Sequence, residues 1–160
     1  MREILFRGKT KGTMFTESKW VEGFYYVYKG KYAGSDKIDF EHPTITTGIV
    51  ECSGGYGERS ERIESKVIPE TVGQYTGLTD KNGKKIFEGD IVNVNTNKDT
   101  LCHRYEGRNL VIRFDEYHRF VASGRLEYPL CNHYEYEVIG NIHDNPELME
   151  GVQEDENEKE

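Results

Sequence analysis

The sequence predicts a mostly β protein with very little helix. Tyr and Gly are frequent, with 11 and 17 among 160 residues, and turn-forming pairs recur while long apolar stripes of helical period are absent. We expect an antiparallel N-terminal sheet region followed by a small C-terminal SH3-like or partly open β-barrel. One continuous sheet shared by both regions is the alternative arrangement.

In the N-terminal region, residues 4–6 predict a first strand and residues 20–28 a second. Side chains alternate between the two faces of a strand, and both faces of the second strand are apolar or aromatic. One face carries Trp20, Phe24, Tyr26 and Tyr28, and the other carries Val21, Tyr25 and Val27. Because large apolar patches are seldom left open on a monomer, either the C-terminal domain or a second copy should cover one of these faces, and we expect self-association through this strand.

Strand signals continue at residues 44–52 and 62–68, which can pair across a glycine-rich loop. Pro69 restricts the residue before it to extended backbone and marks the expected domain boundary. The predicted domains are therefore an N-terminal β region at 1–68, a small barrel at 69–149 and a disordered acidic tail at 150–160. The barrel strands are expected at 72–78, 86–95, 109–115, 119–123 and 135–142, with one short helix at 147–150.

The clearest local signal is the run VGQYTGLTDKNGKKIFEGDIVNV at residues 72–94. Asn82-Gly83 tolerates positive φ, so the chain can reverse tightly between two apolar runs. Gly89-Asp90 then predicts a second turn, after which Ile91 opens a β-branched strand. These residues specify a fold and not a reaction.

Three segments also support a family resemblance. The run ETVGQYTGLTDKNGKKIFEGDIV at 70–92, the opening REILFRGK at 2–9 and the closing YEVIGNIHDNPELM at 136–149 resemble the YopX family, small proteins of bacterial phages and prophages. The resemblance implies a mostly β fold and a phage or prophage origin. It implies no activity and no functional residues.

The absence of a membrane-spanning run and the scattered cysteines favour an intracellular protein, and the family resemblance implies the cytoplasm of a bacterial host. The chain contains no apolar run of the roughly 18 to 20 residues that a membrane span requires, and its three cysteines are scattered, as in a reducing compartment. The net charge is −8, of which residues 150–160 contribute −5. Such a self-repelling segment predicts the disordered tail.

Two sets of residues are candidates for a functional site, one for binding zinc and one for binding nucleic acid. An up-and-down order of barrel strands would bring together Cys102, His103, Cys131 and His133, whose thiols and imidazoles form a legitimate zinc set. Their spacing differs from the usual zinc-binding clips, which favours unrelated loop residues. Acidic pairs such as Asp115-Glu116, and Glu135 with Glu137 on one strand face, lack a partner nucleophile. We therefore expect no catalytic residue and no cofactor.

The second set combines tyrosines with lysines and is a candidate for binding nucleic acid, because bases can stack on the rings while lysines contact the phosphates. It comprises Tyr25, Lys29, Lys31, Tyr32 and Lys37. The net charge of −8 opposes binding to phosphates, which favours packing of these tyrosines in a sheet or in a subunit interface. We therefore expect a non-catalytic interaction protein whose partners are a second copy and an unidentified host or phage protein. A nucleic-acid-binding module and a metal-dependent enzyme are the alternatives.

Overall fold

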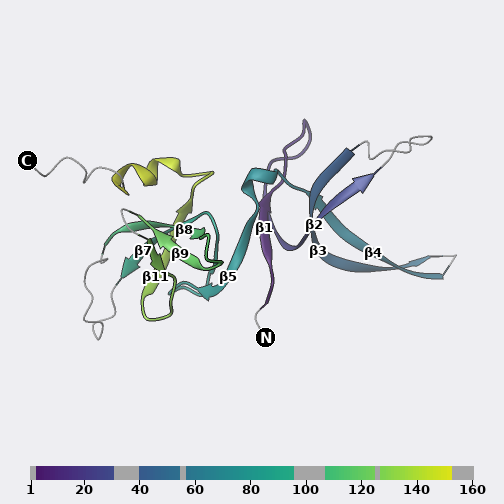
Figure 1. Cartoon of the computed structure of the whole chain (residues 1–160). Coiled ribbons are helices and arrows are strands. Elements are labelled where there is room, and N and C mark those ends of the chain that lie inside the picture. Colours follow the sequence, from purple (N-terminus) through teal and green to yellow (C-terminus); the bar gives the residue numbers. More distant parts are fainter. Residues whose placement is uncertain (1–2, 31–39, 55–56, 96–106, 125–126, 153–160) are drawn as a thin grey trace, which may run out of the picture. The chain divides into compact units, whose positions relative to one another are not determined.

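The chain is a mostly β protein, as the sequence predicts. The computed structural model describes residues 3–30, 40–54, 57–95, 107–124 and 127–152 (Figure 1). Helical residues within these ranges are confined to two 3-10 segments, η1 (Pro69–Thr71) and η3 (Pro146–Val152). None of the helices in the described part of the chain has the length and apolar character needed to cross a membrane. The predicted acidic tail lies almost wholly outside the described residues.

The chain divides into two compact units, of which the first comprises Glu3–Gln74 and the second begins at Tyr75. The boundary falls within strand β5 (Gly73–Thr79). The first two residues of β5 pair with β1, whereas Tyr75 and Thr79 pair with β6. One strand therefore contributes backbone hydrogen bonds to both units.

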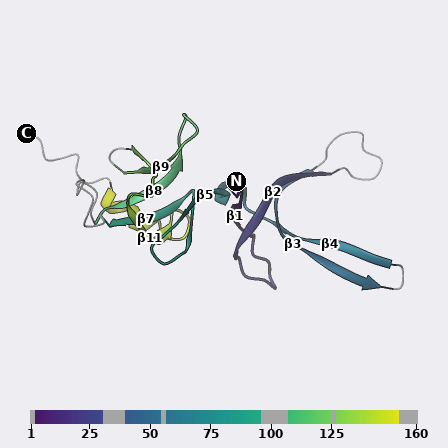
Figure 2. The same ribbon diagram turned by 90° about the horizontal axis from the view of Figure 1, so that it is seen from below.

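The N-terminal unit is built from β1 (Phe6–Lys9), β2 (Trp20–Gly30), β3 (Phe40–Gly54) and β4 (Gly57–Lys66). They are antiparallel neighbours in the order β4-β3-β2-β1, and β5 follows on the other side of β1. Figures 1 and 2 show β3 and β4 side by side along their length. The polar residues after β1 form a loop at 10–19 that connects it to β2.

One face of this sheet forms the core of the N-terminal unit. Side chains of Val21, Ile45 and Val67 are buried together, and Phe6, Tyr25 and Val72 pack against them. The chain after β4 returns to β1, where Thr10 and Val67 form an antiparallel bridge and Ile68 N donates to Lys9 O at 2.9 Å. This return covers the inner face and leaves the opposite face of β2 outside the core.

The second sheet has the strand order β10-β9-β8-β7-β11 and is not closed into a barrel within the described residues. Its strands are β7 (Asp90–Asn95), β8 (Asn109–Phe114), β9 (Phe120–Ser123), β10 (Glu127–Pro129) and β11 (Glu135–Asn141). Strand β10 was not anticipated, because its three residues include a proline. The core of the unit comprises Ile86, Val92, Val94, Leu110, Ile112, Phe120, Ala122 and Tyr136.

The predicted single strand at 86–95 was wrong in extent, because the chain turns in its middle. Strand β6 (Lys85–Phe87) pairs with β5, whereas β7 pairs with β8 and β11. Gly89 adopts φ +81 at the turn, and the Asp90 carboxylate accepts a hydrogen bond from Phe87 N at 2.8 Å. The Gly-Asp turn identified in the sequence thus separates two strands.

Asp80 organises the hairpin between β5 and β6. Asp80 N donates to Lys84 O at 2.8 Å, and Gly83 N donates to Asp80 O at 2.9 Å. The carboxylate oxygen Oδ1 accepts from Asn82 N and Lys84 N at 2.8 and 2.9 Å. Among these residues only Gly83 has positive φ, at +81. The loop is therefore a turn followed by one left-handed residue, and not a tight pair with two positive φ angles.

The β8–β9 hairpin repeats this arrangement with Asp115 in place of Asp80. Asp115 N donates to Arg119 O at 2.8 Å, and His118 N donates to Asp115 O at 3.1 Å. The Asp115 carboxylate accepts from Tyr117 N and Arg119 N at 3.0 and 2.8 Å. The left-handed position is occupied by His118, at φ 60, a conformation that favours glycine.

Asp80 also joins its hairpin to the edge of the second sheet. Its other carboxylate oxygen accepts from Val138 N at 3.1 Å, and Lys81 N donates to Tyr136 O at 2.9 Å. The hairpin thereby satisfies polar backbone groups of β11, which pairs with β7 along its other side. We call these contacts of Asp80 and Lys81 with β11 the Asp80 clasp.

Changing the left-handed residue should alter stability in opposite directions in the two hairpins. Nothing lies within 4 Å of a Cβ placed on Gly83, so Gly83→Val tests backbone conformation alone and should cost about 1 kcal/mol or more. His118→Gly should stabilise the unit by roughly 0.5–1 kcal/mol, because glycine adopts positive φ without the strain of a side chain. Urea unfolding followed by circular dichroism measures both, and unchanged midpoints would contradict the assigned conformations.

Stability should depend on pH through Asp80. Burial alone would raise the pKa of Asp80, but hydrogen bonds from Lys84, Val138 and Asn82 and the charge of Lys84 lower it overall. The ionised Asp80 carboxylate therefore contributes its full stabilisation above about pH 4, the pKa of an aspartate in the unfolded chain. This stabilisation is lost as the pH falls through the lower pKa of Asp80 in the folded protein.

Asp80→Asn keeps one acceptor oxygen and should cost about 1–3 kcal/mol at pH 7. Urea titrations at several pH values should show the difference between the two proteins shrinking below about pH 4. A difference that stayed constant down to pH 3 would mean that the ionised carboxylate is not the stabilising species.

Candidate functional site

The outer face of β2 presents a row of aromatic side chains away from the core. Phe24 and Tyr28 are 68% and 49% exposed, and Trp20 and Tyr26 share their side of the strand by alternation. Cross-strand neighbours share a face, so Thr44 lies beside Tyr26 and His42 lies beside Tyr28. Lys66 of β4 lies beside Thr44 on the same face. We call the four β2 side chains, Trp20, Phe24, Tyr26 and Tyr28, the aromatic face.

Cations gather at the Trp20 end of the aromatic face. The guanidinium carbon of Arg7 lies 4.7 Å from the centre of the Trp20 ring, and Lys9 Nζ lies 6.0 Å from it. Arg7 is buried although it carries a charge, and contact with an aromatic ring offsets part of its desolvation. This end of the face therefore combines a planar apolar ring with fixed positive charge.

Gly23 sets how closely β2 and β3 approach beneath the aromatic face. A Cβ at this position would overlap the carbonyl oxygen of Thr46 and would lie 3.0 Å from Ile45 Cγ2. Only glycine fits this spacing without moving the backbone of β3. The residue that interrupts the aromatic strand in the sequence is thus a requirement of the packing.

An open cleft of about 1410 Å³ lies beside β1 in the same unit. One wall is the loop at 10–19, and the other is the segment 65–70 that follows from β4, with His42 and Pro43 of β3. Val67, Ile68, Pro69 and Pro43 supply apolar lining, while Lys66 and Glu70 add charge to the second wall. We call this hollow the β1–β2 cleft.

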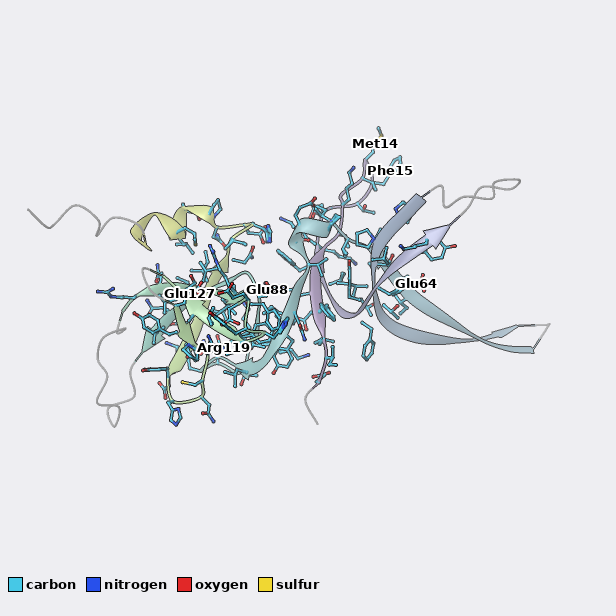
Figure 3. The ribbon with its side chains drawn as sticks, viewed as in Figure 1. Met14, Phe15, Glu64, Glu88, Arg119 and Glu127 are labelled. Carbon is cyan, nitrogen blue, oxygen red and sulfur yellow. The ribbon has the colours of Figure 1, made fainter. Side chains whose placement is uncertain are left out.

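The loop that forms the first wall carries two exposed apolar side chains at its tip. Met14 and Phe15 are 92% and 91% exposed, and Figure 3 shows them at the tip of the loop between β1 and β2. Both residues lie outside every strand that the sequence predicts. The available signal was an apolar pair inside the polar run TKGTMFTESK, where burial in a core is not expected.

The structure separates the residues considered for nucleic-acid binding. Tyr25 points to the inner face, where its ring lies 5.5 Å from that of Phe6 in the core, whereas Lys29 is exposed near the end of β2. Lys31, Tyr32 and Lys37 lie outside the described residues. Among the aromatic side chains of β2, the most exposed are therefore Phe24 and Tyr28, whereas Tyr25 packs in the core.

The proposed zinc set is described only in part. Cys131 is half-buried, and His133 is exposed in the connection between β10 and β11, while Cys102 and His103 lie outside the described residues. Within the described ranges, no three His, Cys, Asp or Glu side chains are grouped so that they would hold a metal ion. The zinc hypothesis stays a prediction.

The acidic residues considered for catalysis have structural contacts. Asp115 Oδ2 lies 2.7 Å from Arg119 Nη2 and completes the turn described above. Glu137 Oε2 lies 2.7 Å from Lys81 Nζ, beside the Asp80 clasp. Asp115 is thus positioned by the hairpin that it helps to form, and Glu137 of β11 pairs with a lysine of the β5–β6 hairpin.

Comparison with known families identifies the relationship of the chain. The family model described as "YopX protein" matches residues 17–150, which include the second sheet, the first sheet apart from β1, the aromatic face and the Asp80 clasp. The chain belongs to the YopX family. The resemblance noted in the sequence is therefore confirmed.

A solved structure of similar fold extends the comparison. The crystal structure of protein EF1440 from Enterococcus faecalis is 28% identical, has a TM-score of 0.53 and covers 94% of this chain and 100% of that chain. No curated protein matches the sequence. The comparisons thus establish a YopX family member and assign it no activity.

Replacement of Gly23 should destabilise the N-terminal unit. Gly23→Ala places a Cβ against the backbone of Thr46 and should cost roughly 1–3 kcal/mol through overpacking. Gly48→Ala is the control, because a Cβ there meets only Ile63 Cδ1, at 3.7 Å. Urea unfolding can be followed by the fluorescence of Trp20, the only tryptophan. Equal midpoints for the two variants would contradict the close approach of β2 and β3.

Proposed function

We propose that this YopX family member is a phage or prophage accessory protein that acts in the host cytoplasm by binding a protein partner and not by catalysis. The aromatic face is the observation that supports this proposal. Phe24, at 68% exposure, stands on a regular strand whose opposite face is fixed in the core. A partner can therefore bury this ring without ordering a flexible segment, which lowers the entropic cost of association.

The composition of the face suits a protein surface. Aromatic side chains and arginine are enriched where protein interfaces become buried. Phe24 and Tyr28 supply exposed rings, and Arg7 and Lys9 surround the indole of Trp20. A complementary partner surface would carry apolar side chains opposite Phe24 and Tyr28.

Single-stranded nucleic acid is the second candidate ligand, because bases stack on aromatic rings while cations contact phosphates. Trp20 with Arg7 and Lys9 supports it, whereas the net charge of −8 opposes it. Binding of labelled single and double strands at low and high salt tests this candidate directly. Affinity that falls steeply with salt and quenching of Trp20 fluorescence are the expected signs.

Substitution of Phe24 tests the protein-binding proposal. The full chain, Phe24→Ser and Tyr117→Ser would each be used to capture proteins from nuclease-treated lysate of phage-carrying host cells. Phe24 and Tyr117 are equally exposed, at 68% each, but Tyr117 lies in the β8–β9 hairpin. A specific partner should be retained by the full chain and by Tyr117→Ser, and reduced at least tenfold with Phe24→Ser, equivalent to about 1.4 kcal/mol.

Two outcomes would contradict the proposal. Capture of the same proteins at the same yield by Phe24→Ser would exclude the aromatic face as the binding surface. Salt-sensitive binding of oligonucleotides that is lost with Phe24→Ser, without any specific protein partner, would favour the nucleic-acid candidate.

A further inference from the structure

The loop that carries Met14 and Phe15 is held in shape by its own hydrogen bonds. Thr13 Oγ1 accepts from Phe15 N and Thr16 N at 3.2 and 3.1 Å, and Thr13 N donates to Thr16 O at 2.9 Å. At the base, Thr10 N donates to Lys19 O at 2.8 Å. The two apolar side chains are thus presented on a preorganised turn, which reduces the ordering cost of binding.

This tip and the β1–β2 cleft have complementary chemistry. The tip consists of two nearly fully exposed apolar side chains, and the lining of the cleft includes Val67, Ile68 and Pro69. Phe alone buries about 150–250 Å² when it enters such a site. An exposed apolar protrusion and an open apolar hollow are therefore present on one unit of one chain.

We propose that Met14 and Phe15 of one copy insert into the β1–β2 cleft of a second copy, and that the second copy does the same in return. The proposal rests on the proposed binding function and names a second copy as one partner. Because the loop at 10–19 is both the protrusion and one wall of the cleft, a two-fold axis beside it produces two identical contacts.

Charge on the cleft walls agrees with this pairing. The loop wall carries Lys11, Lys19 and Glu17, and the opposite wall carries Lys66 and Glu70. Both walls therefore carry both signs, so neither wall presents a field of one sign that would repel an incoming copy. Two Phe and two Met side chains, with the surfaces that they cover, reach about the 1,200 Å² at the lower end of specific interfaces. We expect a dimer with a Kd in the micromolar range.

Sedimentation equilibrium of the full chain between about 1 and 100 μM tests the assembly, a range that spans micromolar affinity. The variants are the double substitution Met14→Ser with Phe15→Ser, Phe24→Ser as a test of the aromatic face, and Tyr117→Ser as the matched control in the β8–β9 hairpin. We expect the double variant to dissociate at least tenfold more readily and the other two variants to dimerise like the full chain. All three variants change exposed side chains, and unchanged circular dichroism shows that each is folded.

A crosslink identifies the site itself. A photoreactive phenylalanine analogue at position 15, in a mixture of isotope-labelled and unlabelled chains, should form intermolecular crosslinks to residues 65–70 or to Pro43. A full chain that remains monomeric at 100 μM, or crosslinks that map elsewhere, would overturn the proposal. Loss of the dimer with Phe24→Ser alone would also overturn it, while leaving the aromatic face as a binding surface. Retained dimerisation without Phe24-dependent capture would instead refute only the proposed function.

Discussion

The carboxylate of Asp80 has more structural consequences than any other single group in the C-terminal unit. It accepts hydrogen bonds from Asn82 N, Lys84 N and Val138 N, so one side chain both shapes a hairpin and binds the edge of a distant strand. An ionised carboxylate is suited to this role because it is acceptor-only and bonds strongly to backbone N–H groups. The short strands of the unit have few ladder bonds each. A local electrostatic contact that fixes the position of β11 therefore matters more here than in a sheet of long strands.

The N-terminal unit depends on a different constraint, the close approach of backbones at glycine. Gly8 and Gly23 lie where a Cβ would press against Val67 and Thr46, respectively. This spacing lets the chain after β4 return to β1 and cover Val21 and Ile45. Tyr25 packs on this inner face, whereas the four side chains of the aromatic face lie on the opposite face. The core and the exposed aromatic face are thus two results of one packing arrangement.

Both candidate surfaces of the YopX family member lie on rigid backbone. The aromatic face belongs to a strand that pairs with β1 over residues 20–23 and with β3 over residues 24–30. Met14 and Phe15 stand on a loop closed by its own threonine hydrogen bonds. Rigid presentation favours recognition of a defined partner surface over adaptation to many. The same unit therefore offers one broad aromatic surface and one small protrusion, which can act on different partners without competing for the same atoms.

Local signals in the sequence were sufficient to predict the mostly β class, the YopX family and the turns at Asp80–Gly83 and Gly89–Asp90, because turn chemistry and strand alternation are local properties. They also placed Trp20, Phe24, Tyr26 and Tyr28 on one face of a strand. Only the tertiary structure decided which face became the core, since that depends on the return of residues 67–72 to β1. It likewise divided 86–95 between two sheets and exposed Met14 and Phe15 beside a cleft. These features arise from contacts between segments far apart in the chain, which no local pattern encodes.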